Sequence, residues 1–209
     1  MVKYILSLPI SKAALVVGIS FITSVVIVTL VDDFLLANFV VPGDTEKLVR
    51  DIQANDNLFL LAVLGYLIVL ILDAIIGFAL YVVLKLSNTK LAFLTAAFRI
   101  LYAFILIISL LGLAFQLTDV YTYASIKLIG YVLFALHLFL LGYTILKSTY
   151  IPKILGLFLI LASFTYLTFF IDLGLPEELL LVIMLVMALA ELSLSLWLII
   201  KRNDLPRIK

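Results

Sequence analysis

Long runs of apolar residues dominate the chain, and short charged or polar clusters separate them. Most of these runs lack the polar face, repeating every 3.6 residues, that a helix on the surface of a soluble protein shows. They also lack the strict alternation of polar and apolar residues that a membrane β-barrel requires. Each run is long enough to cross about 30 Å of hydrocarbon, which takes roughly 20 helical residues. The pattern therefore predicts an all-α, polytopic membrane bundle.

The charges, prolines and polar clusters divide the chain into six predicted transmembrane helices. Pro9 suits the opening turn of the first helix, where a missing N–H costs nothing. Ser87-Asn88-Thr89 and residues 148–152 form tight connections, so the helices that they join are predicted to be antiparallel neighbours. The single transmembrane domain, residues 1–209, has its predicted helices at about 9–31, 57–86, 90–117, 123–148, 151–171 and 176–200, and an extracytoplasmic loop at 32–56.

Composition supports a membrane protein and excludes several other classes. The chain is 66% hydrophobic and its mean hydropathy is +1.34, whereas soluble proteins are roughly 45–50% apolar. It contains no cysteine, which excludes disulfides and cysteine-ligated metals. No basic patch is large enough to bind nucleic acid. The first apolar run, about 19 residues from Ala13 to Val31, exceeds the core of a cleaved signal peptide and predicts a retained helix.

Charges of opposite sign separate to opposite sides of the predicted bundle. Basic residues gather on one side: Lys3, Lys12, Lys85, Lys90, Lys147, Lys153, Lys201, Arg202, Arg207 and Lys209. The opposite loops carry acidic residues: Asp32, Asp33, Asp44, Glu46, Asp51, Asp56, Asp119, Asp172, Glu177 and Glu178. Because basic loops remain in the cytoplasm, both termini are predicted to be cytoplasmic in a bacterial inner membrane.

Four ionisable residues lie inside the apolar runs: Asp73, Arg99, His137 and Glu191. Each is nine to twelve residues from the basic residue at the end of its helix, which corresponds to roughly 13–18 Å of helical rise. Four different helices therefore place a charged or titratable group at one depth near the bilayer midplane. A charge at this depth costs several kcal/mol unless it is paired or hydrated, so these residues are the candidate site.

Small and polar side chains continue each of these helix faces at helical spacing, which turns the faces toward the bundle interior. The supporting polar positions are Tyr66, Tyr81, Thr95, Tyr102, Thr144 and Ser195. Asp73 and Arg99 flank a short hairpin at depths that an arginine side chain can bridge, so they form the firmest predicted pair. Glu191 is the expected second partner of the guanidinium, and His137 is expected to donate to either acid.

The chain resembles the bacterial membrane proteins grouped as domain of unknown function 4386. The most specific part is Tyr131–Leu146 leading into residues 147–156, which is similar to the histidine-to-proline signature of that family. Supporting pieces are residues 54–59, 80–85, 98–100 and 191–198. The resemblance implies an integral membrane protein of about six helices, with Arg99, His137 and Glu191 in matching pieces. It implies no activity, because the family is named for lacking one.

No catalytic or cofactor signature accompanies the charged layer. Nucleotide-binding loops and the H-E-x-x-H motif are missing, and one histidine does not make a multi-histidine zinc site. We therefore predict no metal and no cofactor, and the catalytic residues, if any, are unknown. A serine–histidine pair would need Ser109 or Ser195 beside His137.

Three functions remain open from the sequence. The first is binding of a small molecule or lipid, or proton-linked transport, through the buried charged cluster. The second is a structural or accessory membrane subunit, either a homodimer or a partner of another membrane protein, in which the ions only fix helix packing. The third is a membrane-embedded enzyme that modifies lipids. Membrane lipids are the expected surroundings in each case.

Overall fold

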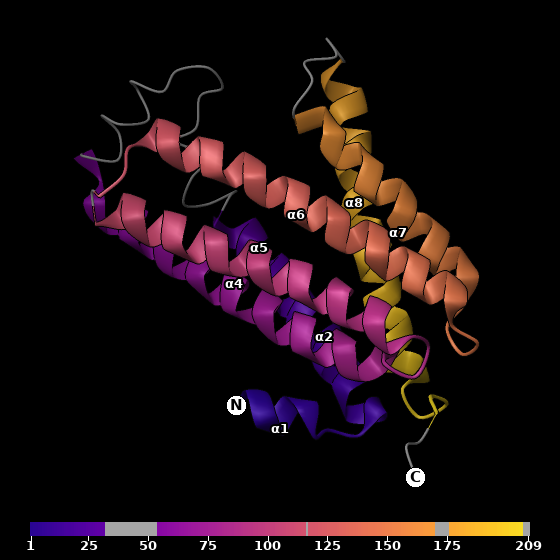
Figure 1. Ribbon diagram of the computed structural model, residues 1–209. Helices are drawn as coiled ribbons and strands as arrows, with labels where there is room; N and C mark the ends of the chain where they lie inside the picture. The colour runs from indigo at the N-terminus through magenta and orange to yellow at the C-terminus, as the bar shows by residue number, and fades with distance from the viewer. Residues whose placement is uncertain (32–53, 116, 170–175, 207–209) are drawn as a thin grey trace.

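The computed structural model describes residues 1–31, 54–115, 117–169 and 176–206, and within these ranges the secondary structure is entirely helical. Figure 1 shows the helices in chain order. Their bounds are α1 Val2–Leu6, α2 Ile10–Leu30, α4 Asp56–Leu84, α5 Thr89–Ala114, α6 Val120–Lys147, α7 Lys153–Thr165, the 3-10 helix η2 Tyr166–Phe169, and α8 Glu177–Lys201.

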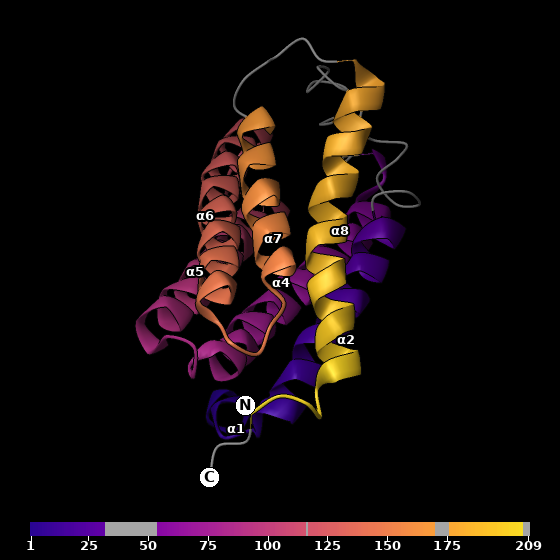
Figure 2. The same ribbon diagram turned by 90° about the vertical axis from the view of Figure 1, so that its right-hand side faces the viewer.

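Six helices pack side by side around a ring. α2 packs against α4, α4 against α5, α5 against α6, α6 against α7 and α7 against α8, and α8 closes the ring against α2. The two ribbon views show this arrangement, with α1 lying across one end (Figures 1 and 2). In this order α5 and α8 occupy opposite positions, so a side chain that joins them must cross the centre of the ring.

Four of the helices are long and apolar enough to cross a membrane: Ile10–Leu30, Asn57–Leu84, Thr89–Ala114 and Tyr121–Lys147. Many large apolar side chains point away from the ring, among them Ile19, Leu64, Phe93, Phe104 and Ile129, and more than half of the surface of each is exposed. Lipid tails suit such a surface and water does not. The all-helical membrane protein expected from the hydrophobic pattern is therefore present, with at least these four spanning-length helices.

The two ends of the ring differ in charge. Lys12, Lys85, Lys90, Lys147, Lys153 and Lys201 stand at the starts of α2, α5 and α7 and at the ends of α4, α6 and α8. We call this the basic end. Asp56, Asp119 and Glu177 stand at the starts of α4, α6 and α8, which lie at the other end. We call this the acidic end.

Local chemistry explains where most helices begin. Pro9, Pro152 and Pro176 immediately precede α2, α7 and α8, and proline suits a helix start because its φ angle is already set. Asn88 caps α5 by accepting a hydrogen bond from the N–H of Leu91 at 3.0 Å. Asp119 caps α6 by accepting from the N–H of Thr122 at 2.6 Å. This bond lowers the pKa of the exposed Asp119 carboxyl.

Several predicted helix bounds need correction. The structure starts α6 at Val120, three residues before the predicted start, because Asp119 caps it. It ends α5 at Ala114, before the predicted residue 117, where the N–H of Leu117 turns back to the carbonyl of Gly112. The hydrophobic pattern did not predict the short helix α1. Residues 32–53, which make up most of the predicted extracytoplasmic loop, lie outside the described residues.

The predicted fifth helix, 151–171, is the least accurate of the six. α7 ends at Thr165 and the chain continues as the 3-10 helix η2 to Phe169. Ser163, Thr165 and Thr168 each donate a hydroxyl hydrogen bond to the carbonyl three residues earlier. Such side-chain bonds compete with the α-helical pattern, so the tighter helix replaces it here. Residues 170–175 lie outside the described residues.

Two glycines allow a close contact between α6 and α7. Gly142 of α6 and Gly156 of α7 face each other, and a Cβ atom added to either would collide with the carbonyl oxygen of the other. Small residues of this kind let membrane helices approach until their backbones touch. The α6–α7 hairpin is therefore packed backbone against backbone at this point.

Tyr150, in the turn between α6 and α7, joins this hairpin to the α4–α5 hairpin. Its hydroxyl donates to the carbonyl of Val83 at 2.7 Å and accepts from the hydroxyl of Ser87 at 2.9 Å. The Val83 carbonyl belongs to the last turn of α4, where carbonyls have no partner inside the helix. Tyr150, in the turn of one hairpin, thus donates the hydrogen bond that a carbonyl at the end of α4 would otherwise lack.

We expect Tyr150→Phe to destabilise the protein by about 1–3 kcal/mol, because it leaves the Val83 carbonyl without its donor. Thermal unfolding of the purified protein measures the loss. Tyr143→Phe is the matched control, since Tyr143 is exposed on α6. Equal effects of the two substitutions would contradict the role given to Tyr150.

The same bond predicts a pH dependence. Burial raises the pKa of the Tyr150 hydroxyl above its ordinary value of 10.0. The folded state therefore favours the protonated phenol. The stabilisation that this gives is complete below the pKa of Tyr150 in the unfolded chain, and it is lost as the pH rises through the higher pKa in the folded protein. Unfolding temperatures measured against alkaline pH should fall more steeply for the wild type than for Tyr150→Phe.

Candidate functional site

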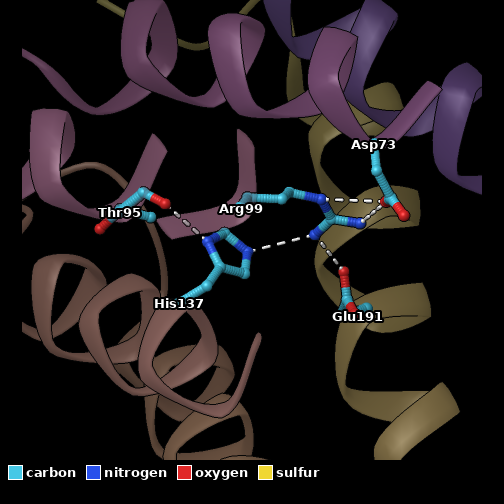
Figure 3. A network of polar contacts seen from close by, with 5 residues as sticks. All are labelled: Asp73, Thr95, Arg99, His137 and Glu191. Atoms are coloured by element: carbon cyan, nitrogen blue, oxygen red, sulfur yellow. Dashed lines mark hydrogen bonds and ion pairs between the residues drawn. The ribbon is translucent and has the colours of Figure 1, made fainter. Parts of the chain in front are cut away.

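The four ionisable residues singled out from the sequence meet inside the ring. Asp73 lies on α4, Arg99 on α5, His137 on α6 and Glu191 on α8. Arg99 occupies the middle, with the other three around its guanidinium group (Figure 3). Arg99 is 2% exposed, Asp73 6% and His137 0%, and the Glu191 side chain is 12% exposed. We call this group the charged cluster.

The guanidinium binds both carboxylates. Its Nε and Nη2 atoms both donate to Oδ1 of Asp73, at 3.1 and 2.5 Å. Its Nη1 atom donates to Oε2 of Glu191 at 2.6 Å. Short bonds between ions of opposite charge are about twice as strong as neutral ones. The predicted Asp73–Arg99 pair is therefore present, and Arg99 links α4 and α5 to α8 across the ring.

His137 is held in one protonation state by its partners. Its Nε2 atom lies 3.1 Å from Nη1 of Arg99, and a guanidinium can only donate, so Nε2 must accept. The ring hydrogen is then on Nδ1, which donates to the backbone carbonyl of Thr95 at 2.7 Å. His137 is therefore neutral here and contacts the arginine. The expectation that it donates to an acid is wrong, because both ring nitrogens have other partners.

Aromatic rings surround the remaining side of the guanidinium. Cζ of Arg99 lies 5.1 Å from the centre of the Phe134 ring, a distance at which a cation is attracted to an aromatic face. The Phe134 ring in turn packs against Tyr102 at 4.7 Å, Tyr166 at 5.4 Å and His137 at 5.5 Å between ring centres. Sequence reasoning missed Phe134 and Tyr166. Phe134 stands one turn before His137 on α6, and that spacing was the available signal.

The supporting polar positions divide into two groups. Tyr102 reaches the cluster through Phe134, and Thr95 reaches it through its carbonyl. The Thr95 hydroxyl lies 3.4 Å from that of Thr144, which also donates to the carbonyl of Leu140 at 2.7 Å. Of the remaining predicted positions, Tyr81 packs against the larger apolar core, Tyr66 packs against a smaller one, and Ser195 is buried.

The cluster divides the ring interior into two halves. Between it and the basic end the core is fully packed, and the large side chains there are at most 2% exposed. They come from α4, α6, α7 and α8: Leu80, Leu84, Leu138, Leu141, Ile145, Leu159 and Leu198. Protein interiors of this density exclude water. The side facing the acidic end holds the aromatic group of Tyr102, Phe134 and Tyr166.

The chemistry of the cluster rests on its carboxyl groups. Arg99 keeps its charge at all ordinary pH values, and His137 is neutral while its two bonds persist. Among the residues that the structure describes, no three His, Cys, Asp or Glu side chains are grouped to hold a metal ion. The guanidinium between the two acids would also repel a metal cation. The two carboxyl groups, each bound to Arg99, are therefore the acidic groups that a function of this cluster would use.

We expect Arg99→Leu to lower the free energy of unfolding by about 3–5 kcal/mol, because it leaves two buried carboxyl groups without their cation. Thermal or denaturant unfolding in detergent measures the loss. The triple substitution Arg99→Leu, Asp73→Asn and Glu191→Gln removes all three charges together and should recover most of that stability. An Arg99→Leu protein as stable as the wild type would contradict the pairing.

Comparison with known proteins places the chain in a family without assigning an activity. An uncharacterised protein of Archaeoglobus fulgidus is 36% identical over 106 residues, which is 51% of this chain and 63% of the relative. The chain thus matches less than two thirds of that relative's length. No solved structure matches the chain. A family model matches residues 16–119 and 112–201, so nearly the whole chain belongs to the family described as "Domain of unknown function (DUF4386)".

Proposed function

We propose that this protein is a six-helix transporter-like membrane protein that binds a small molecule and exchanges a proton at the charged cluster. The proposal rests on the ratio of acidic to basic groups in the charged cluster. One guanidinium contacts two carboxyl groups in a buried site. If both acids are ionised, the cluster holds one uncompensated negative charge, which is costly away from water. One bound proton, or one bound cationic group of a ligand, removes that cost.

Glu191 is the acid that we assign to proton exchange. Asp73 accepts two hydrogen bonds from Arg99, whereas Glu191 accepts one. Hydrogen bonds between ions are the strong ones, so Asp73 is the more firmly bound of the two acids. The Glu191 side chain is also the more exposed of the two, at 12% against 8% for the Asp73 side chain. A ligand or proton would therefore meet Glu191 first.

Access from the acidic end is supported by the polarity of that half. Three buried hydroxyl groups among the described residues have no hydrogen-bond partner, those of Ser24, Ser109 and Thr118. All three lie between the cluster and the acidic end, and buried hydroxyls of this kind usually bind water. The buried apolar group in this half is also smaller than the core between the cluster and the basic end. Proton and ligand would accordingly enter from the acidic side.

Six membrane spans and cytoplasmic termini are part of the proposal. α8 has 25 residues, or about 37 Å at 1.5 Å per residue. α7 and η2 together have 13 and 4 residues, roughly 28 Å, close to the thickness of the hydrocarbon core. The positive-inside rule assigns the basic end to the cytoplasm of a prokaryotic cell.

A packing role for the same ions is the second candidate. Arg99 joins three helices through its two acid partners, and His137 adds a fourth. Ion networks of this kind can fix helix register without taking part in any reaction. The two candidates differ in one measurable property, because only the first requires a carboxyl group that changes its protonation.

We expect Glu191→Gln to abolish that change. Infrared spectroscopy of the protein in lipid bilayers detects protonated carboxyl groups, and the wild type should show one that titrates with pH. The band should be missing in Glu191→Gln, which keeps the shape of the side chain, and should be weakened in Asp73→Asn, because one acid then faces one guanidinium. A wild-type spectrum without a titrating carboxyl band would refute proton exchange and favour the packing role.

Cysteine labelling can test the spans and the path, because the natural chain has no cysteine. In intact cells a membrane-impermeant thiol reagent should modify Tyr121→Cys at the acidic end and should not modify Thr149→Cys at the basic end. Ser109→Cys, on the proposed path, should react from the acidic side, whereas Leu141→Cys in the packed core should not react. Labelling of Thr149→Cys in intact cells would reverse the proposed orientation.

A further inference from the structure

A cavity lies at the basic end, on the side of the packed core away from the charged cluster. Its volume is about 590 Å³, within the range of about 300–1,000 Å³ typical of small-molecule sites. Three parts of the chain form its walls: the α1–α2 connection with the start of α2, the end of α4, and the segment that follows α8. The lining residues are Leu6, Ser7, Leu8, Pro9, Ile10, Ser11, Lys85, Asn203, Leu205 and Pro206.

Lys85 supplies a positive charge in this wall. It is the residue that ends α4, and it is half-buried. In the described part of the structure no carboxylate pairs with it, and the neighbouring acid Asp204 binds Lys201 at 3.2 Å instead. Lys12 and Arg202 stand close by in sequence to the lining residues and add to the positive potential. A half-buried cation without a counter-ion favours an anionic ligand.

The other lining groups suit a phosphate with an apolar attachment. Ser11 and Asn203 offer hydroxyl and amide donors, whereas the Ser7 hydroxyl already donates to the carbonyl of Tyr4. Pro9 opens α2 without a side-chain cap on its first N–H groups. Free N–H groups at a helix start, together with a lysine, are common donors to phosphate oxygens. Leu8, Ile10 and Leu205 are buried beside them and form an apolar wall.

The position of the cavity indicates where such a ligand would be found. α1 lies across this end of the ring (Figure 2). It exposes Met1 and Tyr4 while it buries Ile5 against the bundle. An exposed tyrosine beside basic residues is typical of the membrane–water interface, where the headgroups of lipids lie.

We propose that this cavity binds a phosphate group, carried by an anionic phospholipid or by a soluble phosphate compound, with Lys85 as its charged contact. The site is separate from the charged cluster and does not depend on proton exchange there. Occupation of the cavity would hold together α1, the start of α2, the end of α4 and the segment after α8, and would stabilise the basic end.

Native mass spectrometry of the full-length protein in detergent tests the proposal, with phosphatidylglycerol, phosphatidylcholine and inorganic phosphate as the probes. We expect phosphatidylglycerol to bind more tightly than phosphatidylcholine. Lys85→Gln should weaken this binding about tenfold, the usual effect of losing one charge-assisted hydrogen bond. Lys90→Gln is the matched control, because Lys90 is exposed at the same end and does not line the cavity.

Competition distinguishes the two sources of phosphate. Displacement of the bound lipid by inorganic phosphate assigns the cavity to soluble phosphate compounds, and its failure assigns the cavity to the lipid. Ser11→Trp should fill the cavity and reduce binding in a protein whose thermal unfolding remains cooperative. Equal losses in Lys85→Gln and Lys90→Gln, unchanged binding in Ser11→Trp, or binding of neither phosphatidylglycerol nor inorganic phosphate would each overturn the proposal.

Discussion

The rest of this structure depends on a single guanidinium group at the centre of a ring of helices. An arginine among lipid-facing helices must have its charge and its hydrogen atoms satisfied from inside the bundle. Here α4 and α8 provide a carboxylate each, and α6 provides a neutral imidazole and an aromatic face. These groups can meet only if α8 returns to pack against α2 and closes the ring. The charge and the ring closure therefore depend on each other.

The ring interior serves two different purposes along its length. Toward the basic end it is a dense apolar core of leucine, valine and isoleucine side chains with almost no exposure. Toward the acidic end it holds tyrosines and hydroxyl groups beside a smaller apolar group of Val63, Leu70, Leu106 and Leu110. The dense core holds Arg99 in place from one side, whereas the opposite half combines hydroxyl groups with a smaller apolar group.

Features that depend on position along a helix could be predicted from the sequence, whereas features that depend on how helices pack could not. The common depth of the four ionisable residues could be predicted, because it follows from counting helical residues to the nearest charged helix end. These residues are Asp73, Arg99, His137 and Glu191. Which helix neighbours which is not contained in any run of apolar residues, and neither are the roles of Phe134 and Tyr166. The 3-10 helix after Thr165 arises from local hydroxyl bonds that apolar periodicity does not report. The protonation of His137 needed the positions of both its partners.

The order in which the charged residues occur along the chain has a consequence for how the protein enters the membrane. Asp73 and Arg99 belong to consecutive helices joined by a short turn, so the arginine has a carboxylate partner as soon as that hairpin forms. Glu191 belongs to α8, 92 positions after Arg99 in the chain, so it reaches the arginine only after α6 and α7 have been synthesised. Insertion can thus proceed with a compensated pair of charges, and the acid that arrives later completes the cluster.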